Sequence, residues 1–393
     1  MSKEVVIVSA ARTPIGGFLG ALSAIPAPRL GAVAIKAALE RGKIDPKWVD
    51  QVIMGNVLSA GQGQAPARQA MIYSGIPNSV PATTINKVCG SGMQAVNLAR
   101  NAIIAGESEC VVAGGMENMS LAPYLMEEAR TGFRMGEKKI KDSMVSDGLW
   151  DPYNNFHMGS AAELCVKEYK FSREEQDRFA KQSFERAQAA IKSGAFKAEI
   201  ASVSIPQKKG DPVQFDTDEG PAKGDPSKMP GLRPVFEKDG TITAANASTI
   251  NDGASALVVT SREFADRHGL KPLARILSCG IHAQAPEWFT TAPVEAMKKA
   301  LKKAGLAPND IDLWEVNEAF AVVALAAAKG LEIPESKLNV NGGGISLGHP
   351  IGSSGSRLLT TLVYGLAARD AKRGLASLCI GGGEGIAMVI ERV

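Results

Sequence analysis

PATTINKVCGSGMQAVNL, residues 81–98, is the stretch on which the interpretation of the whole chain depends. β-Branched and apolar residues lead up to Cys89, a Gly-Ser-Gly sequence follows at 90–92, and residues 93–105 have a helix-like pattern. Glycines allow positive φ values in such a turn, and the N-terminus of a helix favours a thiolate over a thiol. The stretch predicts a strand, a sharp turn and a helix, with Cys89 either a nucleophile or a small packing residue.

The composition is that of a globular protein large enough for two or three domains. Of the 393 residues, 45% are hydrophobic and 22% charged, and a net charge of +3 is too small to indicate nucleic acid as a partner. No apolar run reaches membrane-spanning length and no signal peptide is recognised, so a cytoplasmic protein with no membrane partner is expected. Five scattered cysteines without CxxC spacing indicate free thiols, and they predict neither disulfides nor a metal site.

Strand-like and helix-like segments alternate along most of the chain. The expected helices are 28–41, 66–74 and 93–105, and the expected strands are 4–9, 52–57, 109–113 and 255–260. Such alternation predicts a largely parallel sheet covered by helices on both faces. Residues 120–245 are more polar and longer-looped, and they include a helix from Ser172, where Glu175 completes a capping box. We expect this region to be an insertion in the sheet domain.

An internal repeat indicates that the chain was duplicated. Residues 34–50 read AIKAALERGKIDPKWVD and residues 296–312 read AMKKALKKAGLAPNDID, with six identical positions that include Pro46 with Pro308 and Asp50 with Asp312. Later strand and helix units also correspond in order, which favours duplication over generic similarity between βα units. If the halves pack with pseudo-two-fold symmetry, distant strand ends would meet at one ligand site.

Four polar groups are expected at these strand ends: Cys89, Asn317, His349 and Cys379. A cysteine nucleophile needs a base, usually His, and acyl transfer needs donors aimed at the developing oxyanion. A second cysteine fits a further proton transfer, such as deprotonation next to a carbonyl. Each residue has a simpler alternative: His349 as a loop cap, Cys379 as a packing residue and Asn317 as a helix N-cap. The other cysteines, Cys110, Cys165 and Cys279, lack glycine-rich turns and are expected to pack in the core.

The motifs NKVCGSG, GGMENMS, NEAF, NGGGISLGHPIGSSGSR and CIGGGEG together resemble the thiolase family over essentially the whole chain. FHMGSAAE and TAANASTINDGA are most similar to the short-chain acetoacetyl-CoA thiolases of that family. The resemblance implies an α/β thiolase fold, with two duplicated α/β domains in five layers, αβαβα, and an inserted loop domain. It implies that 1–119 with 246–270 form the N-terminal half, 120–245 the insertion, and 271–393 the C-terminal half.

The resemblance also implies roles for the residues at the strand ends. Cys89 would accept the acyl group, His349 would activate it, and His349 would form one oxyanion hole with a water held by Asn317. Cys379 would be the acid/base, and the backbone N–H groups of Cys89 and Gly381 would form a second oxyanion hole. The implied reaction is a ping-pong Claisen condensation of two acetyl-CoA to acetoacetyl-CoA and coenzyme A. The alternative is a longer-chain 3-ketoacyl-CoA thiolase of fatty-acid breakdown.

A coenzyme A site is implied mostly on the insertion, with no cofactor beyond the substrates and no metal. The residues implied at the pantetheine and adenine ends are Leu149, His157, Met158, Leu232, Val235, Phe236, Ala244, Ser248 and Phe320. Phe289 would line the acyl pocket, where its bulk favours short chains. Bacterial biosynthetic relatives have an Arg for the nucleotide where this chain has 220–223, GPAK, so Lys223, Lys228 or Arg233 is expected near the phosphates. Part of 120–141 is expected to form the contact of a homotetramer.

Two other function classes agree less well with the sequence. A nucleotide-binding oxidoreductase would need GxGxxG after the first strand and an acidic residue about 20 positions later, which the chain lacks. A non-catalytic homologue that only binds coenzyme A would not need Cys89, Asn317, His349 and Cys379 together.

Overall fold

The computed structural model describes residues 3–393, which are built around one ten-stranded sheet. The strand order is β14-β15-β16-β13-β1-β12-β5-β3-β4, with the short β2 beside β12. The strands are β1 (Val5–Arg12), β2 (Gly16–Gly17), β3 (Gln51–Gly55), β4 (Ala82–Ile85), β5 (Cys110–Asn118), β12 (Asn251–Ser261), β13 (Ala274–Ala283), β14 (Leu313–Val316), β15 (Arg373–Ile380) and β16 (Glu384–Arg392).

The sheet consists of two halves with the same topology, and in residues 3–393 strand pairing joins them where Val6 and Ile7 of β1 pair with β13. In the N-terminal half β3 runs parallel to β4 and β5, and β12 is antiparallel to β5 and β1. In the C-terminal half β14 is parallel to β15, β16 is antiparallel to β15 and β13, and a parallel bridge from Leu338 to Trp314 takes the place of β4. The prediction of a largely parallel sheet is therefore wrong, because β12 and β16 each run antiparallel to the strands on both sides of them.

The duplication predicted from the repeat is confirmed by matching hydrogen bonds in the two halves. Asp50 accepts two bonds on Oδ2, from the backbone N–H groups of Glu109 (2.7 Å) and Cys110 (2.9 Å). Asp312 accepts two bonds on the same atom, from Lys372 (2.9 Å) and Arg373 (2.8 Å). Each aspartate thus fixes the start of the central strand of its half, β5 or β15.

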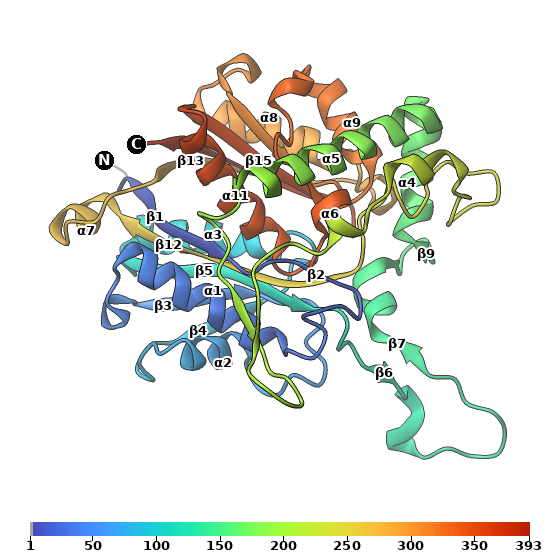
Figure 1. The fold of residues 1–393 in the computed structure, drawn as a ribbon, viewed down its shortest axis with the longest axis horizontal. Coiled ribbons are helices and arrows are strands. Elements are labelled where there is room, and N and C mark those ends of the chain that lie inside the picture. Colours follow the sequence, from blue (N-terminus) through green and yellow to red (C-terminus); the bar gives the residue numbers. More distant parts are fainter. Residues whose placement is uncertain (1–2) are drawn as a thin grey trace.

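The two halves of the sheet form two β layers, and helices lie outside each half and between the halves. The fold therefore has five layers, αβαβα (Figure 1). The main helices are α1 (Ala27–Gly42) and α2 (Pro66–Tyr73) outside the N-terminal half, α3 (Ser91–Ala105) and α11 (Ser354–Ala368) between the halves, and α8 (Ala292–Ala304) and α9 (Ala321–Leu331) outside the C-terminal half. Two short helices are α7 (Arg262–Arg267) and α10 (Gly344–Leu347). Within residues 3–393, no helix is both long and apolar enough to cross a membrane.

The chain between β5 and β12 forms the insertion. It contains the helices α4 (Met158–Tyr169), α5 (Arg173–Ser193) and α6 (Gly220–Lys223), and the strand pairs β6 (Tyr124–Leu125) with β7 (Lys141–Asp142), β8 (Trp150–Asp151) with β9 (Phe156–His157), and β10 (Val203–Ile205) with β11 (Val213–Phe215). The predicted capping box starts α5: Ser172 Oγ accepts from the Glu175 N–H, and Glu175 Oε2 from the Ser172 N–H. The β6–β7 segment extends away from the body of the molecule (Figure 1). The bounds assigned to the three parts of the chain stay a prediction.

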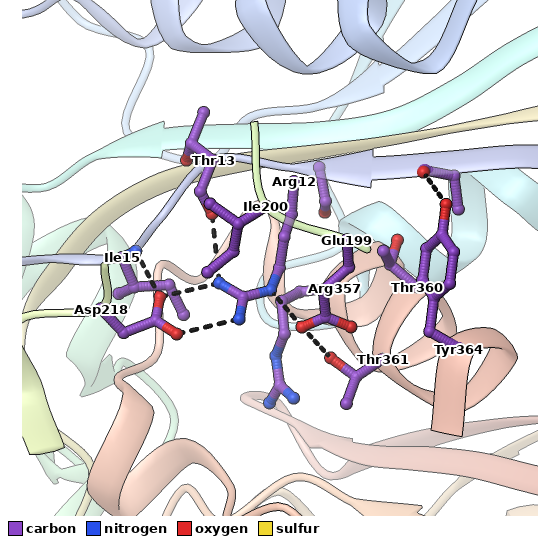
Figure 2. Close-up of polar contacts among 12 residues, drawn as sticks. Arg12, Thr13, Ile15, Glu199, Ile200, Asp218, Arg357, Thr360, Thr361 and Tyr364 are labelled. Carbon is purple, nitrogen blue, oxygen red and sulfur yellow. Dashed lines mark hydrogen bonds and ion pairs between the residues drawn. The ribbon is translucent and has the colours of Figure 1, made fainter. Parts of the chain in front are cut away.

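Arg12 at the end of β1 holds the insertion on the sheet. Its guanidinium pairs with both carboxylate oxygens of Asp218, at 2.7 and 2.9 Å, and with Glu199 at 2.6 Å (Figure 2). All three side chains are buried. Asp218 also accepts the N–H of Ile15 (2.8 Å), so the 218–223 segment is tied to the loop that follows β1. Buried charges need such pairing, because an unpaired one is strongly destabilising.

Candidate active site

A cavity of about 780 Å³ brings most of the predicted site residues together. The predicted catalytic residues that line it are Cys89, His349 and Gly381. Twelve residues predicted to bind the substrate line it as well: Leu149, His157, Met158, Lys223, Lys228, Leu232, Val235, Phe236, Ala244, Ser248, Phe289 and Phe320. Arg233 is not among the lining residues. Most of the cavity surface is apolar, as is usual for a site that encloses a small molecule.

Cys89 lies in the turn between β4 and α3, as predicted, but the turn is not made by glycine conformations. Val88 has the positive φ (45°), whereas Gly90 has φ −80°. A β-branched residue in this region is strained, and strain of this kind is found at functional sites. Ser91 holds the turn, because its Oγ accepts the Lys87 N–H (2.8 Å) and donates to the Val88 carbonyl (2.7 Å).

The two glycines of the turn are required by close packing instead. A Cβ on Gly90 would lie 2.5 Å from Ile380 Cδ1, at the end of β15. A Cβ on Gly92 would lie 2.6 Å from Ser356 Oγ on α11. The absence of side chains at 90 and 92 therefore lets the C-terminal half approach the thiol of Cys89.

The thiol of Cys89 faces the backbone N–H groups of Gly381 and of Cys89 itself. Burial nevertheless raises the pKa of Cys89 to about 11, and the nearby Glu117 carboxylate adds to the increase. The expectation that the start of α3 favours a thiolate is wrong for this state of the protein. The N–H groups at 90 and 91 bond to carbonyls of the turn, at 3.0 and 3.1 Å, and desolvation outweighs the remaining donors.

His349 lies in the loop between α10 and α11, not at a strand end as expected. Its Nδ1 is 2.6 Å from Ser354 Oγ, and that hydroxyl also donates to the Pro350 carbonyl (2.9 Å). With the hydroxyl proton given to that carbonyl, Nδ1 of His349 donates to Ser354 and Nε2 is the acceptor nitrogen of the ring. Burial, with a smaller effect of Arg357, lowers the pKa of His349 to about 3. The residue is a neutral imidazole with its basic nitrogen available.

Asn317 and Cys379 are fully buried and do not line the cavity. Asn317 follows β14, and its Nδ2 lies 3.4 Å from the ring nitrogens of His349. Its Oδ1 is buried and has no hydrogen-bond partner in the described part of the chain. Cys379 lies in β15, where burial raises its pKa well above the ordinary value and the proximity of Cys89 raises it further. Cys110, Cys165 and Cys279 are buried, as predicted.

Glu117, at the end of β5, is a site residue that sequence reasoning did not identify. Its carboxylate accepts the backbone N–H groups of Val57 (3.0 Å), Leu58 (3.1 Å) and Gly352 (2.9 Å), and Nδ2 of Asn56 (2.8 Å). The contact with Gly352 fixes the His349 loop to the N-terminal half. Burial raises the pKa of Glu117 to about 7. Its only signal in the sequence was its place in GGMEN, and the same holds for Ser354 in GSSGS.

Aromatic side chains shape the cavity where the insertion meets the C-terminal half. His157 stacks on Phe236 with ring centres 4.8 Å apart, and its Nδ1 accepts the Gly159 N–H (3.0 Å). Phe320 meets Phe236 and Phe289 edge to face, at 6.0 and 6.3 Å. A wall of this kind suits the apolar part of a ligand.

The predicted lysines at the cavity already have acidic neighbours. Lys223 lies 3.0 Å from Glu219, and Lys228 lies 3.1 Å from Asp225. Both amines are well exposed, so a phosphate would compete with weak ion pairs. Among residues 3–393, no group of three or more His, Cys, Asp or Glu side chains could hold a metal ion.

Comparison with known proteins agrees with this geometry. The family model described as Thiolase, N-terminal domain matches residues 5–263, and that described as Thiolase, C-terminal domain matches 270–392. An acetyl-CoA acetyltransferase of Cupriavidus necator is 57% identical, and the match covers 99% of each chain. Acetyl-CoA acetyltransferase 2 of Arabidopsis thaliana is 53% identical over 99% of this chain and 97% of its own.

A solved structure is also similar over the full length. The crystal structure of the Bacillus anthracis acetyl-CoA acetyltransferase superposes with a TM-score of 0.97 at 41% identity, and the match covers 100% of this chain and 99% of that one. The predicted fold is confirmed, and this chain belongs to the thiolase family.

Proposed function

We propose that this protein is an acetyl-CoA acetyltransferase, which condenses two acetyl-CoA to acetoacetyl-CoA and coenzyme A and catalyses the reverse reaction. Full-length relatives with that name, up to 57% identical, support the reaction. One structural observation supports the site more than any other: Cys89 shares a cavity with His349, and its sulfur faces the N–H of Gly381. No cofactor beyond the thioesters is required by this chemistry.

In the first half-reaction, Cys89 Sγ attacks the carbonyl carbon of acetyl-CoA while its proton passes to Nε2 of His349. The transfer accompanies the attack, because the pKa values of about 11 for Cys89 and about 3 for His349 favour a neutral resting pair. The N–H groups of Cys89 and Gly381 donate to the oxyanion of the tetrahedral intermediate. Coenzyme A leaves as a thiolate and takes the proton of Cys379. Acetyl-Cys89, an imidazolium and a Cys379 thiolate remain.

In the second half-reaction, the Cys379 thiolate removes an α-proton from the second acetyl-CoA. The imidazolium of His349, with a water held by Asn317, stabilises the enolate oxygen. The enolate carbon attacks the acetyl carbon, the bond to Cys89 Sγ breaks, and Cys89 recovers its proton from His349. The high pKa of the buried Cys379 makes its thiolate basic enough for this step. The enzyme ends in its starting protonation state: coenzyme A has taken the proton of Cys379, and the α-proton of the second acetyl-CoA has replaced it.

Coenzyme A would lie along the aromatic wall, with pantetheine near Ser248 and Ala244 and its phosphates near Lys223 and Lys228. We also propose a homotetramer in the cytoplasm that binds neither nucleic acid nor a membrane. The β6–β7 segment supports the oligomer, because it exposes large apolar side chains at Tyr124, Met135 and Ile140.

Acyl chain length is the test that separates this proposal from a longer-chain thiolase. Thiolysis rates would be compared for acetoacetyl-CoA and for 3-ketoacyl-CoA substrates of up to about eight carbons. We expect kcat/KM to fall as the chain lengthens, because Phe289 is buried in the wall against Phe320. Phe289→Leu should raise the relative rate with the longer chain, by up to about tenfold for the space of a methylene or two. A preference of the unmodified enzyme for eight carbons would establish the alternative.

A further inference from the structure

A second cavity, of about 290 Å³, lies apart from the proposed active site. It is mostly polar and is lined by side chains of α3, β13 and α8. The lining residues are Asn97, Arg100, Asn101, Leu277, Ser278, Cys279, Ile281 and Lys303, none of which lines the larger cavity. Two cationic side chains and no carboxylate are among them, so the cavity carries net positive charge.

The cationic and amide side chains of this second cavity have few protein partners, whereas Ser278 donates to the Ala300 carbonyl (2.7 Å). Lys303 Nζ donates one bond, to the Cys279 carbonyl (2.9 Å), and Arg100 reaches only Asn101, at 3.4 Å. Among residues 3–393 neither cation forms an ion pair, and Arg100 Nε is buried without a partner. Asn97 is only 7% exposed and makes no side-chain hydrogen bond to the described chain. Lys303 is exposed, but Asn97 and Arg100 Nε are buried, and buried polar groups without protein partners indicate that something else meets them.

The sequence repeat shows what occupies the matching place in the other half. Arg41 holds the same position in residues 34–50 as Lys303 holds in 296–312. As Lys303 donates to the Cys279 carbonyl on β13, Arg41 lies 3.5 Å from the Ala10 carbonyl on β1. Both β1 and β13 have a bulge just before these carbonyls, so the two positions correspond in structure as well.

In the N-terminal half this place is filled by the insertion. Arg41 also donates to the carbonyls of Glu199 (2.7 Å) and Ile200 (2.5 Å). The Glu199 carboxylate enters beside them and accepts bonds from Arg12 (2.6 Å) and from Thr361 of α11 (3.2 Å) (Figure 2). The first half therefore satisfies its cations with a carboxylate and carbonyl oxygens. The second half has the cations and a cavity, but no segment of residues 3–393 fills it.

We propose that the second cavity is a binding site for a small oxyanion, either a carboxylate or a phosphate. Lys303 and Arg100 supply charge-assisted donors, and the Asn97 amide supplies a further one. The volume corresponds to roughly ten water molecules at about 30 Å³ each, which is room for an inorganic oxyanion or a short carboxylic acid. Burial raises the pKa of Cys279 to about 11, and the positive charges of Lys303 and Arg100 act in the opposite direction.

Two measurements test the site on the intact enzyme. Crystals of the unmodified protein soaked in selenate should show an anomalous peak within hydrogen-bond distance of Lys303 and Arg100. Calorimetric titration at constant ionic strength, with coenzyme A present to fill the larger cavity, should detect binding of inorganic phosphate or of succinate. The ligand that binds more tightly identifies the phosphate or the carboxylate class.

A matched pair of variants shows whether the heat comes from this cavity. Lys303→Met should weaken binding by about tenfold or more, since it removes one charge-assisted bond. Lys302→Met removes the same charge from the neighbouring exposed residue and should leave affinity unchanged. Equal affinities for the two variants would overturn the proposal. A selenate peak without binding in solution would mean an adventitious ion only, and would also overturn it.

Discussion

The N-terminal and C-terminal halves have the same strand order but differ in the turn that follows β4 or, in the second half, the matching bridge at Leu338. In the first half, residues 86–92 include Cys89, and a bridge joins Lys87 with Cys89. In the second half, residues 339–344 include three successive glycines, and a bridge joins Val340 with Gly342. A Cβ at Gly342 would lie 2.7 Å from Ala187 of α5. The two halves therefore differ in what the turn can hold: the first has room for the side chain of Cys89, and at Gly342 the second has no room for a side chain.

The halves also differ in the connection between their two central strands. The insertion joins β5 to β12 and supplies most of the cavity wall, whereas residues 381–383 alone join β15 to β16. The short turn places the N–H of Gly381 on the sulfur of Cys89. One copy thus supplies the nucleophile and the ligand cavity, and the other supplies His349, Cys379 and the donor at Gly381.

The largest effect on activity is expected when the nucleophile, which the first half supplies, is removed. Cys89→Ser should lower turnover by at least about 10⁴-fold, because residues that act as a unit lose most of their effect together. After mixing with acetyl-CoA, mass spectrometry should find an acetyl group on Cys89 of the unmodified protein and none in the variant. Cys279→Ser, at a buried cysteine outside the larger cavity, is the control and should keep the adduct. An adduct on Cys379 alone would reverse the assigned roles.

The contribution of the second half is tested by Cys379→Ser. We expect this variant to form acetyl-Cys89, because coenzyme A leaves as a thiolate and can take a proton from water, but to lose condensation by about 10²–10⁴-fold, the usual effect of general acid–base catalysis. Quenched-flow mass spectrometry separates the adduct from the product. A variant that fails to acetylate, although folded by circular dichroism, would show that the proton of Cys379 is required for coenzyme A to leave.

Acid should act on the second half through His349. Its folded pKa is about 3, so between pH 6.5 and 3 the unfolded chain binds a proton that the folded protein does not. The free energy of unfolding should therefore fall as pH falls through this window, by about 1.4 kcal/mol per unit from this residue. In His349→Gln this dependence is absent. Urea unfolding at pH 4 to 7 should therefore show that the free energy of unfolding of the unmodified protein falls, relative to that of the variant, as the pH falls. Parallel curves would contradict a buried neutral imidazole.

The shared frame is tested by the repeat pair Asp50→Ala and Asp312→Ala. Each change removes two hydrogen bonds to backbone N–H groups, and we expect each to lower the free energy of unfolding by about 1 kcal/mol. Denaturant unfolding would compare the two variants side by side. A loss in only one half would mean that the aspartates are not structurally equivalent.

The smallest effect is expected at the lysines of the insertion. Lys223→Met and Lys228→Met should each raise KM for coenzyme A by about two- to fivefold and leave kcat unchanged, because exposed charge pairs contribute little. Lys238→Met is the control, an exposed lysine of the insertion that does not line the cavity. If all three variants have the KM of the unmodified enzyme, the phosphates bind elsewhere.

Local patterns were enough to predict much of the fold. Helix 28–41 and the capping box at Ser172 are confirmed because periodicity and capping act within a few residues. The residues expected around the ligand lie at one cavity because the resemblance extended over the whole chain. Strand direction was not predictable in this way. It depends on which strands become neighbours of β12 and β16 in the sheet, and local sequence does not specify those neighbours.

The site differed from expectation where a residue's pKa or role depends on burial and on contacts with residues distant in sequence. The helix start at α3 suggested a thiolate at Cys89, but the C-terminal half covers the thiol and raises its pKa. Glu117 and Ser354 were not identified, because their importance comes from bonds to Gly352 and to His349 that form only in the folded protein. Val88 adopts a positive φ that the neighbouring glycines were expected to adopt.

The pairing of β1 sets a condition on how the protein is made. β1 hydrogen-bonds to β12 and β13, so its partners leave the ribosome about 250 residues later, on the order of 12–50 s at about 5–20 residues per second. By contrast, β3, β4 and β5 are joined by α2 and α3, so the strands that pair with one another lie close together in the chain. During synthesis the first strand is therefore an apolar segment whose pairing partners are made long after it.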